Sequence, residues 1–120
     1  MAQENSNKSV SPLIHRILAY TQIELTGDLS LKAFAKRLNV NTSYLSTLFS
    51  KEMGMTLTEY VNQRRIAYGK NLLINTQYSI QKIALQCGFS DAKYFSRVFK
   101  QITGISPTEY RNIQKSDSHK

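Results

Sequence analysis

Residues 88–112 read GFSDAKYFSRVFKQITGISPTEYRN, and residues 39–62 read NVNTSYLSTLFSKEMGMTLTEYVN. The two stretches align along their whole length if the later one carries a single additional residue near its start. Aromatic, aliphatic and glycine positions coincide, whereas several polar positions between them differ. We infer one structural unit that occurs twice, with a common framework and two different surfaces.

The earlier copy begins with two short predicted helices. In the first, the apolar residues follow the spacing of one helix face after Ser30, a suitable N-cap, and Asn39 tolerates the left-handed conformation at its end. The second should begin near Asn41 or Thr42 and end at Gly54. The predicted core positions are Leu31, Phe34, Ala35 and Leu38 in the first helix, and Tyr44, Leu45, Leu48 and Phe49 in the second.

The later copy repeats this pattern. Ser79 takes the place of the cap, and Gly88 takes the place of Asn39, as expected if both end a helix with positive φ. Gly104 corresponds to Gly54. The predicted core positions are Ile80, Ile83, Ala84 and Cys87, followed by Tyr94, Phe95, Val98 and Phe99.

Both copies close with a capping box. Thr56 and Ser106 are the expected caps, and Glu59 and Glu109 follow three residues later. Pro107 suits the first turn of a helix. Two short helices joined by a tight turn and flanked by supporting helices form a helix-turn-helix, and this chain contains two.

The predicted fold is therefore all-α, with about seven helices in two helix-turn-helix subdomains joined by a long connecting helix. A first helix from Pro12 to about Leu25 should pack on the first subdomain through apolar residues such as Ile17. The subdomains are expected at 11–55 and 76–113, with the connecting helix at 56–75 and an apolar stripe along it. The polar flanks 1–10 and 114–120 are predicted to be disordered.

The polar positions opposite the apolar residues of each second helix differ between the copies at three of four places. We call them the outer faces: Ser43, Ser46, Thr47 and Ser50 in the first copy, and Lys93, Ser96, Arg97 and Lys100 in the second. In a helix-turn-helix such a face enters the DNA major groove, where hydroxyls bond donors or acceptors and Arg binds guanine bidentately. A connecting helix of about 25 Å is compatible with two successive grooves, about 34 Å apart.

The charge of the chain supports a polyanionic partner. The net charge is +8, and the twelve basic and four acidic residues between positions 29 and 112 account for all of it. Phosphate binding releases condensed counterions and so favours basic surfaces. Charge by itself is a weak indicator, because many basic domains bind no particular ligand.

The composition also argues against several kinds of site and several classes of protein. Cys87 is the only cysteine, which rules out an internal disulfide and a cysteine-rich metal site, and His15 and His119 are far apart in the sequence. We predict no metal, no cofactor and no enzymatic activity. Without a long apolar run or a signal-peptide pattern, we expect a soluble, cytoplasmic protein without a membrane partner.

On these residues the sequence resembles the DNA-binding domain of the AraC/XylS family from about residue 11 to residue 112. The resemblance is strongest over residues 83–111, IALQCGFSDAKYFSRVFKQITGISPTEYR, and includes YLSTLFSKEMG (44–54) and RIAYGKNLL (65–73). It implies a two-lobed fold and transcriptional regulation, usually activation, through RNA polymerase. By resemblance, the expected base contacts are Ser43, Ser46 and Thr47 in the first unit, and Lys93, Ser96 and Arg97 in the second.

The family also implies a second domain, so the chain is expected to be the DNA-binding part of a longer protein controlled by an effector or a phosphorelay. As this domain it should be a monomer, with dimerisation through the missing domain. Two departures stand out. The first outer face carries only small hydroxyl side chains, and Gly69 stands where relatives favour Ala, at a cost of about 0.5–1 kcal/mol in mid-helix.

Contacts to the DNA backbone are expected from a second set of residues, Thr42, Ser50, Lys51, Arg64 and Lys100. Lys51 and Lys100 could equally compensate the C-terminus of their helices. Arg64 and Arg65 could both contact phosphates, or one could be tied to an acid such as Asp91 as an internal brace. Arg65 is the expected brace, whereas Arg64 is expected to face solvent or phosphate. Asp91 is expected to be a helix cap rather than a base contact.

Three rival functions stay open. Cys87 could be a thiol acceptor of alkyl groups, although its apolar helical position and the absence of a nearby His argue against a nucleophile. The first outer face carries only small hydroxyl side chains, which would suit a protein–protein adaptor that has lost DNA binding. A nonspecific DNA-coating protein would show steep salt dependence with little sequence discrimination.

Overall fold

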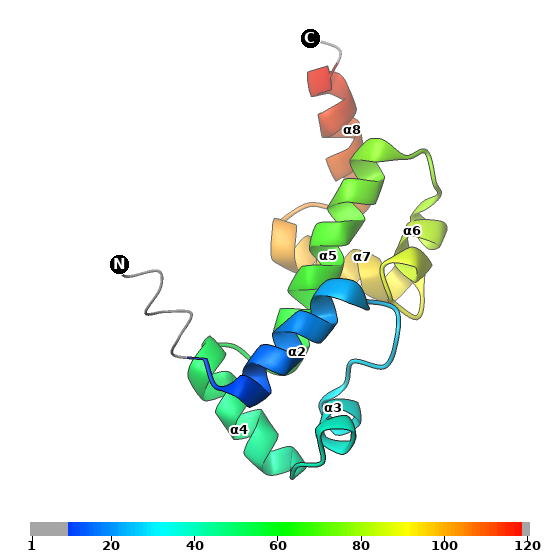
Figure 1. Ribbon diagram of the computed structural model, residues 1–120. Coiled ribbons are helices and arrows are strands. Elements are labelled where there is room, and N and C mark those ends of the chain that lie inside the picture. Colours follow the sequence, from blue (N-terminus) through cyan, green and yellow to red (C-terminus); the bar gives the residue numbers. More distant parts are fainter. Residues whose placement is uncertain (1–9, 119–120) are drawn as a thin grey trace. The chain divides into compact units, whose positions relative to one another are not determined.

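The computed structural model describes residues 10–118 and folds that part of the chain into seven helices without strands (Figure 1). The expected all-α class with about seven helices is therefore confirmed. The chain divides into two compact units at the bond between Val61 and Asn62, inside the connecting helix α5 (Leu57–Asn75). We call residues up to Val61 unit 1 and residues from Asn62 unit 2.

Unit 1 contains α2 (Pro12–Ile23), α3 (Leu31–Leu38), α4 (Thr42–Met53) and the first turn of α5. The hydroxyls of Ser11 and Ser30 cap α2 and α3 by accepting from the amides of Ile14 and Ala33. The helix α2 ends at Ile23, two residues before the predicted boundary. The buried core of unit 1 consists of Ile14, Ile17, Leu29, Phe34, Ala35, Leu45, Phe49, Leu57 and Val61.

Polar contacts fix α2 within this unit. The amide of Ser11 donates a 2.7 Å hydrogen bond to Oε1 of Glu52, near the end of α4. Thr21 is fully buried, and its hydroxyl donates to the carbonyl of Leu18 and lies 3.4 Å from the Tyr60 hydroxyl. A buried hydroxyl without partners would cost free energy, so these contacts make its burial tolerable.

Unit 2 contains the rest of α5, α6 (Ile80–Gln86), α7 (Ala92–Thr103) and α8 (Pro107–Ser118). The ring of Phe95 packs in a tilted arrangement against Phe89 at 5.4 Å and Phe99 at 5.7 Å, measured between ring centroids. Phe99 in turn meets Tyr110 edge-on at 5.4 Å. The buried core consists of Ile66, Leu72, Leu73, Ile83, Ala84, Cys87, Phe89, Phe95, Val98 and Phe99.

Arg111 ties α8 to the end of α5. Its Nε donates to the carbonyl of Leu73 at 3.1 Å, and a terminal guanidinium nitrogen donates to the carbonyl of Thr76 at 3.2 Å. The last carbonyls of a helix lack partners within the helix, and here a charged donor satisfies that of Leu73 together with the carbonyl of Thr76 just beyond the helix.

The apolar stripe predicted along α5 contributes to both cores. Val61 belongs to the core of unit 1, and Ile66 belongs to that of unit 2, whereas Ala67 is exposed. Gly69 is buried, and a Cβ atom built on it would lie 3.0 Å from Cε1 of Phe95. The glycine therefore allows a close approach of α7, which offsets its low helix propensity.

The two ends of the chain were predicted to be disordered. The segment 1–10 lies almost wholly outside the described residues, except for Val10, which packs against the core of unit 1. At the other end, α8 does not stop at residue 113 but continues to Ser118. No Gly or Pro follows Pro107, so nothing in the sequence terminates the helix earlier.

Candidate nucleic-acid interface

The turn between the first two helices of each helix-turn-helix has the same hydrogen-bond pattern. In unit 1 the amide of Val40 donates to the carbonyl of Ala35 at 2.9 Å, and the amide of Asn39 donates to that of Lys36 at 3.2 Å. In unit 2 the corresponding bonds of Phe89 and Gly88 are 2.9 and 3.1 Å. This is the Schellman arrangement, which needs a left-handed residue just after the helix.

That left-handed residue is Asn39 in unit 1, with φ of 58°, and Gly88 in unit 2, with φ of 103°. The predicted equivalence of these two positions is confirmed. Asn tolerates the left-handed region, whereas the larger φ of Gly88 is accessible mainly to glycine.

The second helix of each helix-turn-helix is called the recognition helix, and here these helices are α4 and α7. They begin and end in the same way. The carboxamide oxygen of Asn41 accepts from the amide of Tyr44 at 3.0 Å, and the carboxylate of Asp91 accepts from the amide of Tyr94 at 2.8 Å. Asp91 is thus the helix cap that we expected. Gly54 and Gly104 end the helices with φ of 74° and 91°.

The predicted capping boxes form in both units. The amides of Thr56 and Ser106 donate to Glu59 and Glu109 at 2.9 and 3.0 Å, and the hydroxyls accept in return at 3.1 Å. Hydrogen bonds from Ser106 hold the pKa of Glu109 below its usual value. These boxes fix the helix that follows each recognition helix.

The outer faces are largely solvent-accessible. Ser43, Ser46 and Thr47 are exposed on α4, whereas Ser50 is half-buried. On α7, the exposed outer residues are Lys93, Arg97 and Lys100, and Ser96 is half-buried. The residues predicted to contact bases thus lie together on one helix in each unit, and their contact with DNA stays a prediction.

One position of the predicted core is wrong. Tyr44 was expected on the apolar face of α4, but 56% of it is exposed. Its counterpart Tyr94 meets the ring of Phe89 edge-on, with 5.5 Å between centroids. Val40 occupies the position of Phe89 in unit 1, so Tyr44 has no ring against which to pack.

Arg97 is oriented by its own helix. Its guanidinium carbon lies 5.7 Å from the centroid of the Tyr94 ring, within the range of a cation–π contact. The Tyr94 hydroxyl lies 3.5 Å from the side-chain nitrogen of Asn62 on α5. An exposed cation with a supporting ring is suited to a planar bidentate contact.

The residues predicted to contact the DNA backbone are more scattered. Thr42 opens α4 and is exposed, and Lys51 and Lys100 are exposed in the last turns of their helices. Arg64 is half-buried, and its Nε is buried without a hydrogen-bond partner in the described part of the chain. Arg65 places its guanidinium 5.9 Å from the Phe89 ring, in keeping with an internal role.

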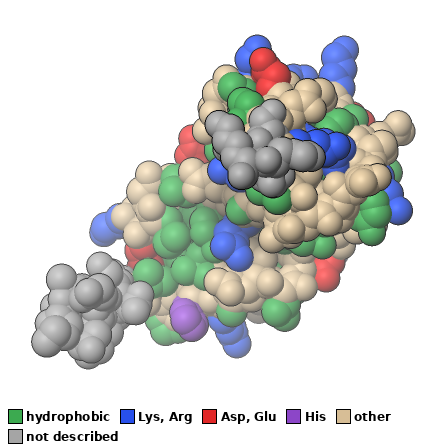
Figure 2. Space-filling view, turned by 90° about the horizontal axis from the view of Figure 1, so that it is seen from above, with side chains coloured by type: hydrophobic (Ala, Val, Ile, Leu, Met, Phe, Trp, Pro, Cys, Tyr) green, Lys and Arg blue, Asp and Glu red, His purple; other side chains and the backbone are tan. Residues whose placement is uncertain are grey.

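Unit 1 carries its cations mainly on α3. Lys32, Lys36 and Arg37 line a hollow of about 640 Å³, together with Asp28, Ser30 and Ala33. Arg37 lies 4.5 Å above the Tyr20 ring. The spacing of Lys32 and Lys36, one helical turn apart, was available in the sequence as an indication of this basic surface. Figure 2 shows basic side chains spread over the face of the molecule that it draws.

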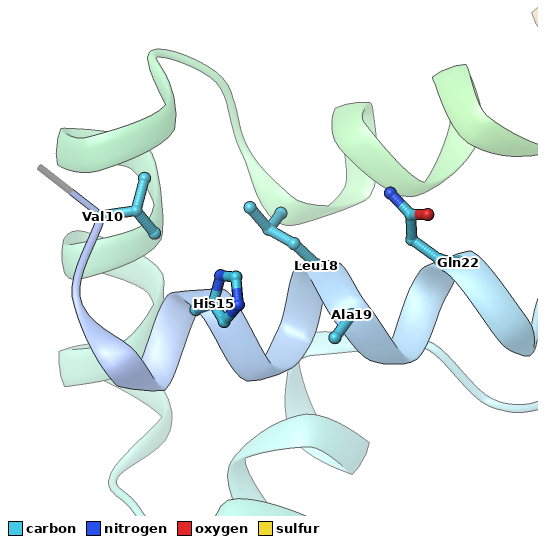
Figure 3. Close-up of a pocket in the computed structure, with 5 residues that line it drawn as sticks. All are labelled: Val10, His15, Leu18, Ala19 and Gln22. Atoms are coloured by element: carbon cyan, nitrogen blue, oxygen red, sulfur yellow. The ribbon is translucent and has the colours of Figure 1, made fainter. Parts of the chain in front are cut away.

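A second hollow, of about 580 Å³, lies along α2 of unit 1 (Figure 3). Val10, His15, Leu18, Ala19 and Gln22 line it, and His15 is the only titratable residue among them. A single exposed imidazole with aliphatic neighbours lacks the paired groups of general acid–base or nucleophilic catalysis. Within residues 10–118, no group of three His, Cys, Asp or Glu residues could hold a metal ion.

Cys87 lies in the core of unit 2, as predicted. Its exposure is zero, and its sulfur is 3.7 Å from the carbonyl oxygen of Ala84. Burial raises the pKa of the thiol to about 12, against an opposing effect of Arg65. A reactive cysteine needs access and a stabilised thiolate, so these features argue against the alkyl-acceptor hypothesis. None of the described helices combines the length and the apolar character that crossing a membrane requires.

Comparison with known families gives a match to the family described as "Helix-turn-helix domain" over residues 34–113. The chain is 35% identical over 109 residues to YtdP of Bacillus subtilis, named an uncharacterized HTH-type transcriptional regulator, and covers 91% of itself and 14% of that protein. It is 32% identical over 101 residues to the HTH-type transcriptional activator RhaR of Salmonella dublin, covering 84% of itself and 36% of RhaR. The chain therefore spans well under half the length of these relatives.

Solved structures give the same picture. The C-terminal domain of AraT, a response regulator from Geobacillus stearothermophilus, superposes with a TM-score of 0.83 at 33% identity, with 87% of each chain covered. The DNA-binding domain of AdpA, solved in complex with a target DNA, gives a TM-score of 0.82 at 21% identity over 89% of this chain and 96% of that domain. At that identity the AdpA domain shows the fold alone.

Proposed function

The chain belongs to the AraC/XylS family of helix-turn-helix transcription regulators, and on that premise we propose that it binds double-stranded DNA sequence-specifically through α4 and α7. The two helices would enter successive major grooves, one from each unit. The base contacts would come from Ser43, Ser46 and Thr47 on α4, and from Lys93, Ser96 and Arg97 on α7. Backbone contacts would come from Thr42, Ser50, Lys51, Arg64 and Lys100.

A single observation carries this proposal. Each unit has the same Schellman turn, the same side-chain cap and the same glycine end around a recognition helix whose outer polar residues reach solvent. A helix so fixed at both ends can present its first turns to base edges, as recognition helices do. The excess of +8 in net charge supplies attraction to phosphates.

The proposal extends to regulation. Relatives named as activators, such as RhaR, favour activation. We further propose RNA polymerase as a second partner, as the family resemblance implies. Because the chain spans a minor part of these relatives, we propose that it acts as the DNA-binding part of a longer effector- or phosphorelay-controlled protein. Binding to the chromosome would place it in the bacterial cytoplasm. The domain itself would be monomeric on its site.

The proposal is tested by selecting bound sequences from a random pool of duplexes, followed by footprinting of the selected site. We expect two unlike half-sites about one helical turn apart, within roughly 20 base pairs. The salt concentration must be held fixed, because phosphate contacts alone give strong binding at low salt.

The same experiment separates the rival functions. Enrichment of no sequence, with a steep dependence of affinity on salt, would identify a nonspecific DNA-coating protein. Absence of duplex binding at any salt concentration would favour the protein–protein adaptor instead.

A further inference from the structure

Tyr44 occupies an unusual position for a tyrosine of this framework. It is the third residue of α4, in the turn that a recognition helix presents to base edges, and it is 56% exposed. Its amide is used by the cap Asn41, but its side chain makes no hydrogen bond or ring contact with the described part of the chain. It flanks the outer face beside Thr47, one turn further along the helix.

The equivalent residue of unit 2 has a different role. Tyr94 is half-buried, packs against Phe89, supports the guanidinium of Arg97 and approaches Asn62 through its hydroxyl. None of these contacts has a counterpart at Tyr44. The retained tyrosine is therefore not explained in unit 1 by packing or by support of a cation.

The chemistry of the surroundings indicates what such a ring can bind. The outer face of α4 carries hydroxyls and no guanidinium, so it lacks the usual bidentate donor for guanine. In the major groove, thymine presents a C5-methyl group, which apolar side chains contact. An exposed ring beside hydroxyls suits an A·T pair better than a G·C pair.

We infer that Tyr44 is a specificity-determining residue of unit 1, whose ring contacts the methyl group of a thymine in the half-site bound by α4. This inference rests on the proposed function. It assigns different tasks to one repeated position, since Tyr94 positions a base-contacting cation whereas Tyr44 contacts a base itself.

The test uses the duplex selected by the wild-type chain, with the variants Tyr44→Ala and Tyr44→Phe. Tyr44→Ala should lower affinity roughly tenfold and relax the preference at one position of one half-site. Tyr44→Phe keeps the ring and should bind as the wild type does. Because Tyr44 is exposed, the melting temperature should change little in either variant.

Replacing the contacted thymine by uracil removes only the methyl group and gives a matched control on the DNA. This change should weaken wild-type binding about fourfold, the value of one buried methyl-sized group, and leave Tyr44→Ala unaffected. Uracil that weakens both proteins equally, a half-site without a preferred thymine, or an equal loss in Tyr44→Phe and Tyr44→Ala would each overturn the ring contact. A wild-type chain that selects no sequence would instead contradict the proposed function.

Discussion

The helices α4 and α7 are fixed by the same devices and carry different surfaces. Each follows a left-handed residue, starts at an Asn or Asp cap and ends at a glycine with positive φ. Outwardly, α4 carries hydroxyls and an exposed tyrosine, whereas α7 carries Lys93, Arg97 and Lys100. The framework of a duplicated unit can therefore stay constant while one buried ring, Phe89 in unit 2, decides whether the neighbouring tyrosine is packed or exposed.

The largest expected effect concerns that ring. Phe89→Ala should destabilise unit 2 by about 3–5 kcal/mol, because Phe89 is 3% exposed and contacts both Phe95 and Tyr94. Val40→Ala at the equivalent position should cost only about 1 kcal/mol, since Val40 is half-buried. Equilibrium denaturation measures both. Equal losses of stability in the two variants would mean that the two turns are packed alike, which would contradict the proposed difference between the units.

The next effect concerns DNA affinity at a pair of equivalent outer positions. Arg97→Ala should weaken binding to the selected duplex by about 1–3 kcal/mol and relax one base position, because a bidentate contact is lost. Thr47→Ala, its counterpart in unit 1, should cost less than about 1 kcal/mol. Arg97→Lys serves as the matched control, because it keeps the charge but not the fork of donors. Unchanged affinity in Arg97→Ala would remove this residue from the interface.

A smaller effect separates the two left-handed positions. Gly88→Asn should destabilise the protein by about 1 kcal/mol, because φ of 103° lies beyond the region that Asn readily adopts. The reverse change, Asn39→Gly at φ of 58°, should shift stability by only a few tenths of a kcal/mol. Thermal melts of both variants suffice. Equal shifts would show that the turns are interchangeable, and the opposite order would contradict the explanation from φ.

The smallest effect is a pH dependence in the capping box of unit 2. The pKa of Glu109 is lowered in the folded chain by hydrogen bonds with Ser106, so its contribution is present above the carboxyl's ordinary pKa and is lost as the pH falls through the lowered value. Glu109→Gln should therefore flatten the acid side of the melting-temperature profile slightly. A profile that stays superimposable on that of the wild type would show that ionisation of Glu109 contributes no measurable stability, since Gln can still form the capping box.

The sequence alone predicts the framework well, because its signals are local. Caps such as Asp91, boxes such as Thr56 with Glu59, and the left-handed Asn39 and Gly88 depend on residues a few positions apart. The repeat then doubles the information, since each copy supports the interpretation of the other. The burial of Cys87 followed in the same way from its place in an apolar pattern.

The features that were missed depend on contacts distant in sequence or on side-chain volume. Periodicity places Tyr44 and Tyr94 alike, and only the size of the residue that follows the left-handed position, Val40 or Phe89, separates them. Arg111 reads as one more basic residue until it is seen bound to the end of α5, more than thirty positions away. For Gly69, the cost in helix propensity was visible, but the proximity of Phe95 that requires it was not.

Cys87 provides a spectator thiol for following the two units separately. It is the only cysteine in the chain, lies in the core of unit 2 and is fully shielded in the folded protein. An alkylating reagent can therefore modify it only during excursions in which unit 2 opens, and the rate of labelling reports the free energy of that opening. Because unit 1 contains no thiol, the labelling rate does not respond to the opening of unit 1. The measurement also needs no engineered cysteine. The rate at which Cys87 is labelled can therefore show how a bound duplex changes the local unfolding of unit 2.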